Sequence, residues 1–293
     1  RIKSMTNVLF WTGYQYNPYD GKSTDNLAGT EIAVINIAKH LSTMGLNVVV
    51  GGELKNTGKI DNVTWADIDT VHKKYYNKFD IIIGVSYLSF IKEFESYSKA
   101  KFIFWTHNTD HFKWHNWEEL NIDYTLRDKS IISKIVCLTE WHKQHYLKKY
   151  NCSEPKVISN GIDKSTFIKT NKKNKNSFLW SSNLDRGCLE LLKNWHMILE
   201  CLPDAQLSVC YPNYANRVNP ELIDEIKKYE CDSVKIIGTL DQKSLHNKMM
   251  ETEYWCYLTD YEETYCITAI EMQYCNVIPI VSTVGGLNET VPY

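Results

Sequence analysis

The sequence predicts an α/β protein built from two tandem Rossmann-like, doubly wound domains. Short apolar runs rich in β-branched residues alternate with amphipathic stretches along the 293 residues. Such strands, nearly continuous in apolar character and separated by helices, indicate parallel sheets that are covered on both faces. The pattern restarts after a polar tract at 169–176, and with 43% apolar residues the chain is long enough to form two cores.

The first domain is expected over residues 1–165. Its first long helix is predicted between 30 and 45, where apolar residues recur at helical spacing and Gly45 is placed to end the helix. The strands expected in this domain are Val8–Thr12, Leu46–Gly51, Phe79–Val85, Phe102–Thr106, Ile135–Leu138 and Lys156–Ser159.

The second domain is expected over residues 166–293. Doubly wound sheets bind ligands outside the carboxyl ends of their strands, so polar residues that follow strands are the candidates for a site. The strands expected here are Phe178–Ser181, Gln206–Cys210, Val234–Ile237, Tyr254–Leu258 and Val277–Val281.

Composition and charge exclude several classes of function. The net charge of -2 and the lack of long basic runs argue against a nucleic-acid partner. No apolar run approaches the roughly 20 residues that cross a bilayer. We therefore expect a cytoplasmic protein without a transmembrane segment, which leaves peripheral membrane contact open. The nine cysteines form no CxxC pair, so we expect reduced thiols and no structural metal.

Two acids, Glu263 and Glu271, are separated by seven residues near the end of the chain. A helix that begins just after Thr264 would place Glu271 in its buried stripe, where the vicinal hydroxyls of a ribose would satisfy the carboxylate. Glu263 precedes that helix, beside backbone amides of Tyr265 and Cys266 that are suited to a phosphate. In the structural alternative, Glu263 caps the helix and Glu271 pairs with a core lysine or tyrosine.

A second candidate is Arg186, which lies between a strand ending at Ser181 and a helix starting near Gly187. This places the arginine at a helix amino end. There a guanidinium offers a fixed fork of donors to a diphosphate, and Gly187 lets the backbone come close. The alternative is a solvated surface arginine.

The first half contributes His107, just beyond an apolar strand, and Gly29, at a tight turn before the first long helix. His107, His111 and His115 are four residues apart, so a metal hydrolase is an alternative. No acid or cysteine at ligand spacing accompanies these histidines, and we expect no metal. The absence of GxGxxG disfavours a nicotinamide or flavin enzyme.

Together these stretches resemble the retaining nucleotide-sugar glycosyltransferases of family 4, which have the GT-B fold. The similar stretches are LAGTEIAVINIAKHLSTMGLNVVV, FWTHN and KVISNGIDKSTF in the first half, and SSNLDRGCLELLKNW and ETYCITAIE, an E-x7-E motif, in the second. Each alone is a weak signal. Their order and spacing, over residues 7–291, are more specific.

The resemblance implies transfer of a hexose from a UDP-, GDP- or ADP-sugar to a hydroxyl group, with retention of anomeric configuration and without a metal or other cofactor. The acceptor, whether glycan, lipid or protein, is left open. The resemblance also implies residue roles: Glu271 for the donor ribose, Glu263 for the transferred sugar or its phosphates, Arg186 for the diphosphate, backbone near Thr239 and Leu240 for the base, and His107 and Gly29 against the sugar and the leaving phosphate.

The chain departs from the family pattern in three places. Ser181 stands where members carry an arginine, and Asn276 stands where they carry a glycine. The crossover helix that normally returns to the first domain is expected to be absent after GGLNETV. Ser181 and the expected absence of the helix support an alternative reading, a non-catalytic nucleotide- or glycan-binding protein of the same fold; asparagine at 276 can adopt the left-handed backbone of the glycine.

Overall fold

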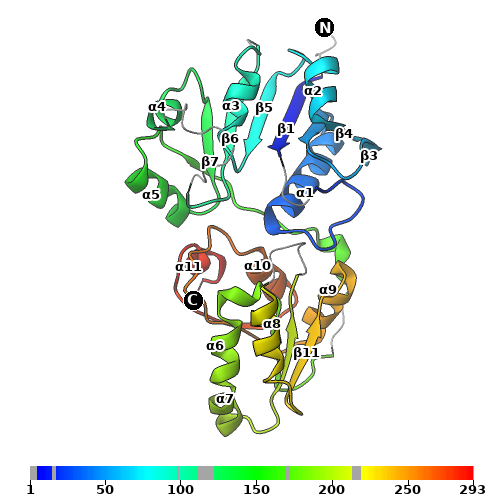
Figure 1. The fold of residues 1–293 in the computed structure, drawn as a ribbon, viewed down its shortest axis with the longest axis vertical. Helices are drawn as coiled ribbons and strands as arrows, with labels where there is room; N and C mark the ends of the chain where they lie inside the picture. The colour runs from blue at the N-terminus through cyan, green and yellow to red at the C-terminus, as the bar shows by residue number, and fades with distance from the viewer. Residues whose placement is uncertain are drawn as a thin grey trace. The chain divides into compact units, whose positions relative to one another are not determined.

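A computed structural model describes residues 5–14, 18–97, 99–110, 122–168, 172–212 and 219–292. The chain divides into two compact units (Figure 1). Unit one contains residues 1–24 and 28–160, and unit two contains residues 25–27 and 161–293.

The sheet of unit one has the strand order β3-β4-β2-β1-β5-β6-β7-β8. Neighbouring strands are parallel except β3 and β4, which form an antiparallel hairpin. The chain moves outward from β1 to β2 and then returns to β5, so the strand order reverses between β1 and β5. The strand bounds are β1 Asn7–Gly13, β2 Asn47–Gly52, β3 Gly58–Ile60, β4 Val63–Asp67, β5 Ile81–Val85, β6 Lys101–Trp105, β7 Lys134–Cys137 and β8 Lys156–Val157.

Helices flank this sheet, and its core is strongly aromatic. Phe90, Phe94 and Phe104 are fully buried together with Leu9 and Ile82 from the central strands. The helices are α1 Gly29–Thr43, α2 Ile68–Lys74, α3 Phe90–Phe94, α4 Ile122–Arg127 and α5 Glu140–Lys149.

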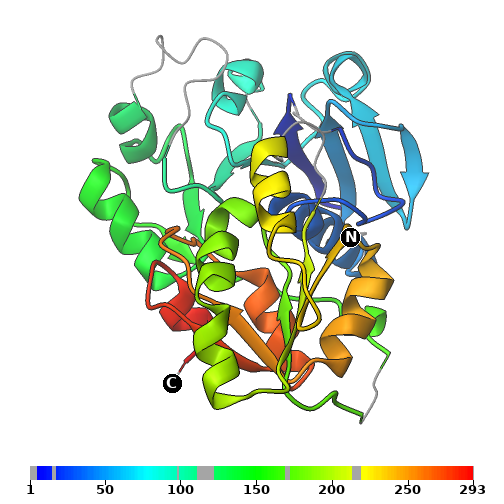
Figure 2. The same ribbon diagram turned by 60° about the horizontal axis from the view of Figure 1, so that its bottom comes forward.

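The sheet of unit two is parallel throughout, in the order β11-β10-β9-β12-β13. The order reverses between β9 and β12, the kind of position at which doubly wound sheets bind ligands. Figures 1 and 2 show α6 and α9 on either side of these strands. The bounds are β9 Ser177–Trp180, β10 Gln206–Cys210, β11 Val234–Gly238, β12 Tyr254–Tyr257, β13 Ile278–Val281, α6 Cys188–Lys193, α7 Trp195–Cys201, α8 Pro220–Lys227, α9 Gln242–Glu251, α10 Ile267–Tyr274 and α11 Leu287–Thr290, with 3-10 turns η2 Lys164–Thr166 and η3 Leu184–Arg186.

Each strand expected from the sequence is present, with ends that shift by at most two residues. The hairpin β3–β4 was not predicted. Gly45 follows the end of α1 with φ 86°, and Asn276 follows α10 with φ 56°, so both adopt the left-handed backbone that ends a helix. Helix α10 begins at Ile267 rather than just after Thr264, because Cys266 is extended with ψ 99°.

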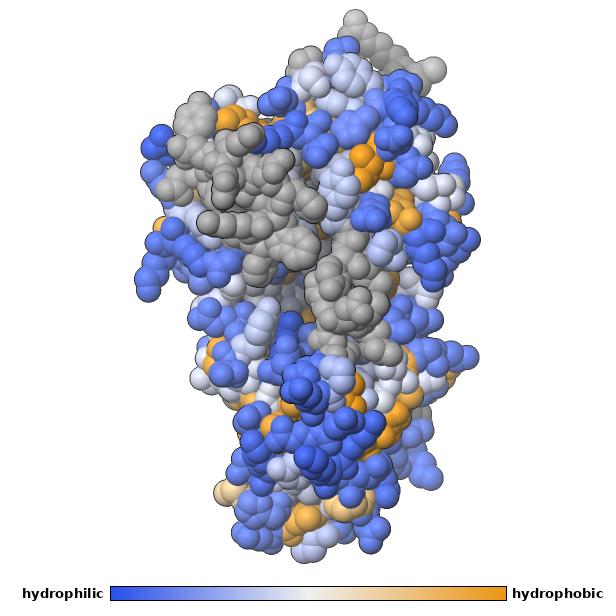
Figure 3. Space-filling view, viewed as in Figure 1, coloured by the Kyte–Doolittle hydropathy of each residue, from blue (hydrophilic) through white to orange (hydrophobic). Residues whose placement is uncertain are grey.

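The coloured residues on the face shown in Figure 3 are mostly hydrophilic, and the hydrophobic ones stand singly or in small groups. Within the described residues, no helix is long and apolar enough to span a membrane.

Candidate functional site

In unit two, the site is organised around an ion pair between Arg186 and Glu263. Arg186 ends the η3 turn that follows β9, and Glu263 lies in the loop between β12 and α10. Nη1 of Arg186 donates to Oε1 of Glu263 at 2.7 Å. Because β9 and β12 are neighbours at the point where the strand order reverses, residues far apart in the chain meet at the carboxyl ends of adjacent strands.

Glu263 is almost fully buried, at 6% exposure, and receives a second hydrogen bond. The hydroxyl of Tyr257, the last residue of β12, donates to the same Oε1 atom at 2.7 Å. Burial beside Glu263 raises the pKa of Tyr257 well above its ordinary value, so the phenol keeps its proton and acts as a donor. Both protein donors therefore meet at one carboxylate oxygen.

The backbone of Glu263 is fixed by the two glycines of the segment 285–286. The amide of Gly286 donates to the carbonyl oxygen of Glu263 at 2.6 Å. Gly285 has φ 62°, and a Cβ atom there would lie 2.6 Å from the same carbonyl oxygen. Only glycine allows this approach. The backbone of 285–286 therefore packs directly against the loop before α10 and holds it in place.

Arg186 stays a cation although it is partly withdrawn from water. Its side chain is 24% exposed, and Cζ lies 4.0 Å from the centre of the Tyr261 ring. Burial is the largest single influence and works against the charge, but Glu263 together with Tyr257 and Tyr261 outweighs it, so the pKa of Arg186 is raised. A guanidinium has five N–H donors, and the bond to Glu263 uses one of them. The alternative of a freely solvated arginine is wrong.

Gly187 makes the turn after Arg186 possible. It has φ 106°, and a Cβ atom would lie 2.3 Å from the carbonyl oxygen of Leu258. The backbone that leads into α6 thus runs against the end of β12. The close approach of this backbone to a diphosphate, expected from the sequence, stays a prediction.

Glu271 lies on the buried side of α10 at 8% exposure, as expected, but its partner comes from α9. Oε1 of Glu271 is 3.5 Å from Nε2 of His246. The imidazole of His246 stacks on Phe167, with ring centroids 3.8 Å apart, and Nδ1 lies 3.4 Å from the carbonyl oxygen of Thr166. The structural alternative named a core lysine or tyrosine for Glu271, and the observed partner is a histidine. Nor does Glu263 cap α10, whose N-cap is Cys266.

The remaining candidates in unit two lie at strand ends or at the start of α10. Ser181 directly follows β9, and its Oγ is buried with no hydrogen-bond partner among the described residues. Thr239 follows β11 and donates from Oγ1 to the carbonyl oxygen of Tyr211 at 3.2 Å, and Leu240 packs at the core edge. Tyr265 is partly exposed and Cys266 is buried, both just before α10.

In unit one, Gly29 is the first residue of α1, and His107 lies two residues beyond β6. The ring of His107 contacts Trp105, with centroids 4.5 Å apart, and its Nε2 atom is buried. Burial, assisted by the nearby His142, lowers the pKa of His107 to about 3. The side chain is therefore a neutral imidazole near pH 7.

The loop of His107 is held by His142 of α5. The amide of Leu138 donates to Nδ1 of His142, so Nε2 carries the proton and donates to the carbonyl oxygen of Asn108 at 3.0 Å. Burial is the largest influence on His142 and lowers its pKa to about 4. Sequence reasoning missed this histidine, because its partners come from two different loops.

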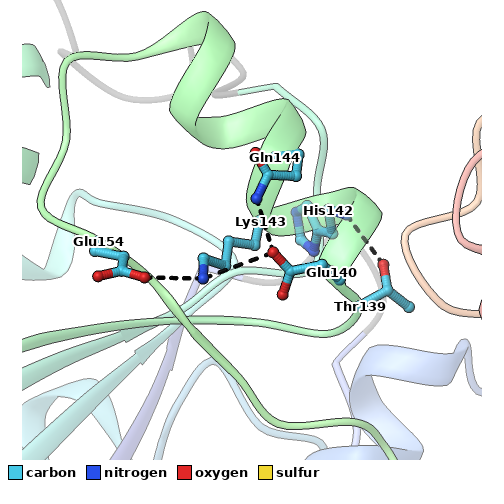
Figure 4. Close-up of polar contacts among 6 residues, drawn as sticks. All are labelled: Thr139, Glu140, His142, Lys143, Gln144 and Glu154. Carbon is cyan, nitrogen blue, oxygen red and sulfur yellow. Dashed lines mark hydrogen bonds and ion pairs between the residues drawn. The ribbon is translucent and has the colours of Figure 1, made fainter.

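The start of α5 is fixed by polar contacts shown in Figure 4. Thr139 accepts the amide of His142 at 3.1 Å, which caps the helix. Lys143 lies between two carboxylates, 2.9 Å from Glu154 and 3.6 Å from Glu140. These contacts orient the helix turn from which His142 reaches the His107 loop.

His111 and His115 lie outside the described residues. Among the residues that the structure describes, no group of three or more His, Cys, Asp or Glu side chains is arranged to hold a metal ion.

Known proteins resemble this chain in structure rather than in sequence. Neither a scan of known protein families nor a search of curated proteins finds a match. Among solved structures, sucrose-phosphate synthase from Thermosynechococcus elongatus aligns with a TM-score of 0.73 and 14% identity, over 98% of this chain and 83% of that chain. The chain has the GT-B fold.

Two further structures are similar at comparable coverage. Anabaena HepE in complex with UDP-glucose aligns with a TM-score of 0.69 and 14% identity, over 98% of this chain and 83% of that one. A glycosyltransferase from Rickettsia africae aligns with a TM-score of 0.68 and 18% identity, over 99% and 83%. GT-B glycosyltransferases consist of two Rossmann-like domains, in agreement with the two sheets described above.

Proposed function

We propose that the chain is a retaining glycosyltransferase of family 4 that transfers a hexose from a nucleoside diphosphate sugar to a hydroxyl acceptor. The observation that carries this proposal is the pairing of Arg186 with Glu263 where the strand order reverses between β9 and β12. Beyond the bond to Glu263, the guanidinium has further N–H donors for an anion, and the carboxylate has a second oxygen for a hydroxyl group. A sugar diphosphate has both groups side by side.

In the proposed reaction, the bond between the anomeric carbon and the β-phosphate oxygen breaks, and its electron pair leaves with the nucleoside diphosphate. The acceptor oxygen forms the new bond on the same face, and its proton passes to the leaving phosphate. Positive charge builds on the sugar ring and negative charge on the phosphate. Arg186 and the amino end of α10 oppose the negative charge on the leaving diphosphate.

The other candidate residues take supporting roles in this proposal. Glu271 accepts from the ribose hydroxyls, and backbone after β11, at Thr239 and Leu240, meets the base. The hydroxyl of Ser181 and the amides near Tyr265 and Cys266 contribute to the phosphate site. In unit one, His107 is a neutral hydrogen-bonding group and Gly29 is the first residue of α1; the family resemblance assigns both to the sugar and the leaving phosphate.

The neighbours support the choice of donor, because the HepE structures were determined with UDP-glucose and with UDP. We extend the donor class to UDP-, GDP- and ADP-sugars, with no metal or other cofactor, and place the reaction in the cytoplasm. The acceptor is a glycan, a lipid or a protein hydroxyl.

A turnover assay tests the proposal. The protein is incubated with each of the three nucleotide sugars and a panel of glycan, lipid and peptide acceptors, and the anomeric linkage of any product is read by NMR. A product with the donor's configuration supports the proposal. Donor binding without turnover favours the non-catalytic binding protein, and an inverted product contradicts the retaining mechanism.

A further inference from the structure

We infer that Tyr257 is a positioning residue for Glu263: its hydroxyl occupies Oε1 of the carboxylate, whereas Oε2, which has no hydrogen-bond partner among the described residues, can accept a hydrogen bond from the transferred sugar. The inference rests on the proposed function and adds to it a residue with no role in the family resemblance described above.

The geometry leaves Tyr257 little freedom. The residue is 0% exposed, and its ring stacks on Trp255 with centroids 5.0 Å apart and an interplanar angle of 12°. On another side it meets Trp180 at 5.4 Å. A ring held between two buried indoles points its hydroxyl in one direction, and that direction is Oε1 of Glu263 at 2.7 Å.

The need for a second donor follows from the charges. Arg186 and Glu263 neutralise each other in the free protein. An incoming diphosphate competes with Glu263 for the guanidinium, because its oxygens also accept charge-assisted bonds in a forked geometry. If Arg186 turns toward the phosphate, Tyr257 remains to hold Glu263.

This arrangement distinguishes a nucleotide sugar from a bare nucleoside diphosphate. In the inferred arrangement a sugar hydroxyl donates to Oε2 of Glu263, so the loss of the Tyr257 hydroxyl should weaken binding of the nucleotide sugar. The affinity for the bare nucleoside diphosphate should change little, because this ligand binds Arg186 but has no sugar hydroxyl.

The experiment is calorimetric titration of wild type and Tyr257→Phe with UDP-glucose and with UDP, or with the GDP or ADP pair if the wild type prefers that base. We expect Tyr257→Phe to weaken binding of the nucleotide sugar by roughly 5- to 15-fold and binding of the bare diphosphate by less than about twofold. The matched control is Tyr254→Phe, the same change at the other end of β12, which should leave both affinities unchanged.

Glu263→Gln distinguishes action through Glu263 from general packing. If Tyr257 acts through the carboxylate, Tyr257→Phe adds little further loss in the Glu263→Gln background. Equal weakening of both ligands, full additivity with Glu263→Gln, or no change in Tyr257→Phe would overturn the inference. A wild type that binds none of the nucleotide sugars would instead overturn the proposed function, and the inference with it.

Discussion

Arg186 and Glu263 are 77 residues apart in the chain, yet their side chains lie 2.7 Å apart. The contact follows from the placement of β12 directly beside β9 in the sheet of unit two. The loops that follow these strands bring a cation and an anion together, and each retains atoms that can bind a ligand.

Removal of the arginine should destabilise unit two. Arg186→Met leaves the buried carboxylate of Glu263 with Tyr257 but no cation, and because Arg186 is partly exposed we expect a loss of about 1–3 kcal/mol in the free energy of unfolding. The double variant Arg186→Met/Glu263→Gln should recover part of that loss. Urea denaturation measures the free energy of unfolding of each variant. If the losses in the two single variants add up to the loss in the double variant, the pair is not coupled.

Gly187 should be intolerant of any side chain. Gly187→Ala forces a methyl group against the carbonyl oxygen of Leu258 in addition to the strain of positive φ, so we expect a loss of more than about 2 kcal/mol. The matched control is Gly45→Ala, because Gly45 also has positive φ but open space around the added Cβ. It should cost about 1 kcal/mol. Equal melting temperatures for the two variants would contradict the close contact.

Acid should destabilise unit one through its buried histidines. The pKa of His107 is lowered to about 3 and that of His142 to about 4, whereas an unfolded histidine titrates near 6.5. As the pH falls below about 6.5, the unfolded chain binds protons at these histidines that the folded chain does not. The free energy of unfolding therefore decreases as the pH falls from about 6.5 toward 4. Between pH 6.5 and 5, each histidine contributes up to about 2 kcal/mol of this loss.

The control for this pH effect is His142→Gln, which offers an acceptor and a donor but does not titrate. Its urea midpoint should fall less steeply between pH 7 and pH 5 than that of the wild type. Parallel curves would show that His142 takes up its proton equally readily in the folded and the unfolded chain, which contradicts the lowered pKa.

His246 should support binding of the ribose. His246→Phe keeps an aromatic ring beside Phe167. It removes both ring nitrogens, and with them the contacts to Glu271, Gln242 and Thr166. We expect UDP to bind roughly 3- to 10-fold more weakly, whereas an analogue without ribose hydroxyls should bind as it does to wild type. Calorimetric titration with both ligands measures the difference. An equal loss for both would assign His246 to packing alone.

The strands of the fold were predictable from the sequence because each is a short apolar run between helical segments. The hairpin β3–β4 was not, because its strands are short and its turn, Asp61–Asn62, contains no glycine. Both turn residues adopt positive φ, at 49° and 65°, the backbone that a two-residue hairpin requires. Aspartate and asparagine adopt this conformation more readily than other residues with side chains.

The site was predictable only in part. Arg186, Glu263 and Glu271 could be identified from motifs, because each occupies a defined position in a local element. Their partners Tyr257 and His246 could not, because strand order and helix packing decide which side chains meet, and a single sequence does not fix either. Tyr257 in particular reads as an ordinary strand residue until β12 is placed beside β9.

The most direct test of the central claim is titration of UDP-, GDP- and ADP-glucose into wild type, Arg186→Lys and Arg186→Ala, with Lys193→Ala as an exposed control on α6. We predict that the wild type and the control bind at least one of these donors. Arg186→Ala should lose at least about tenfold in affinity, and Arg186→Lys, which keeps the charge but not the fork, should fall between them. Failure of the wild type to bind any donor, or equally tight binding by Arg186→Ala, would contradict a role of Arg186 in donor binding.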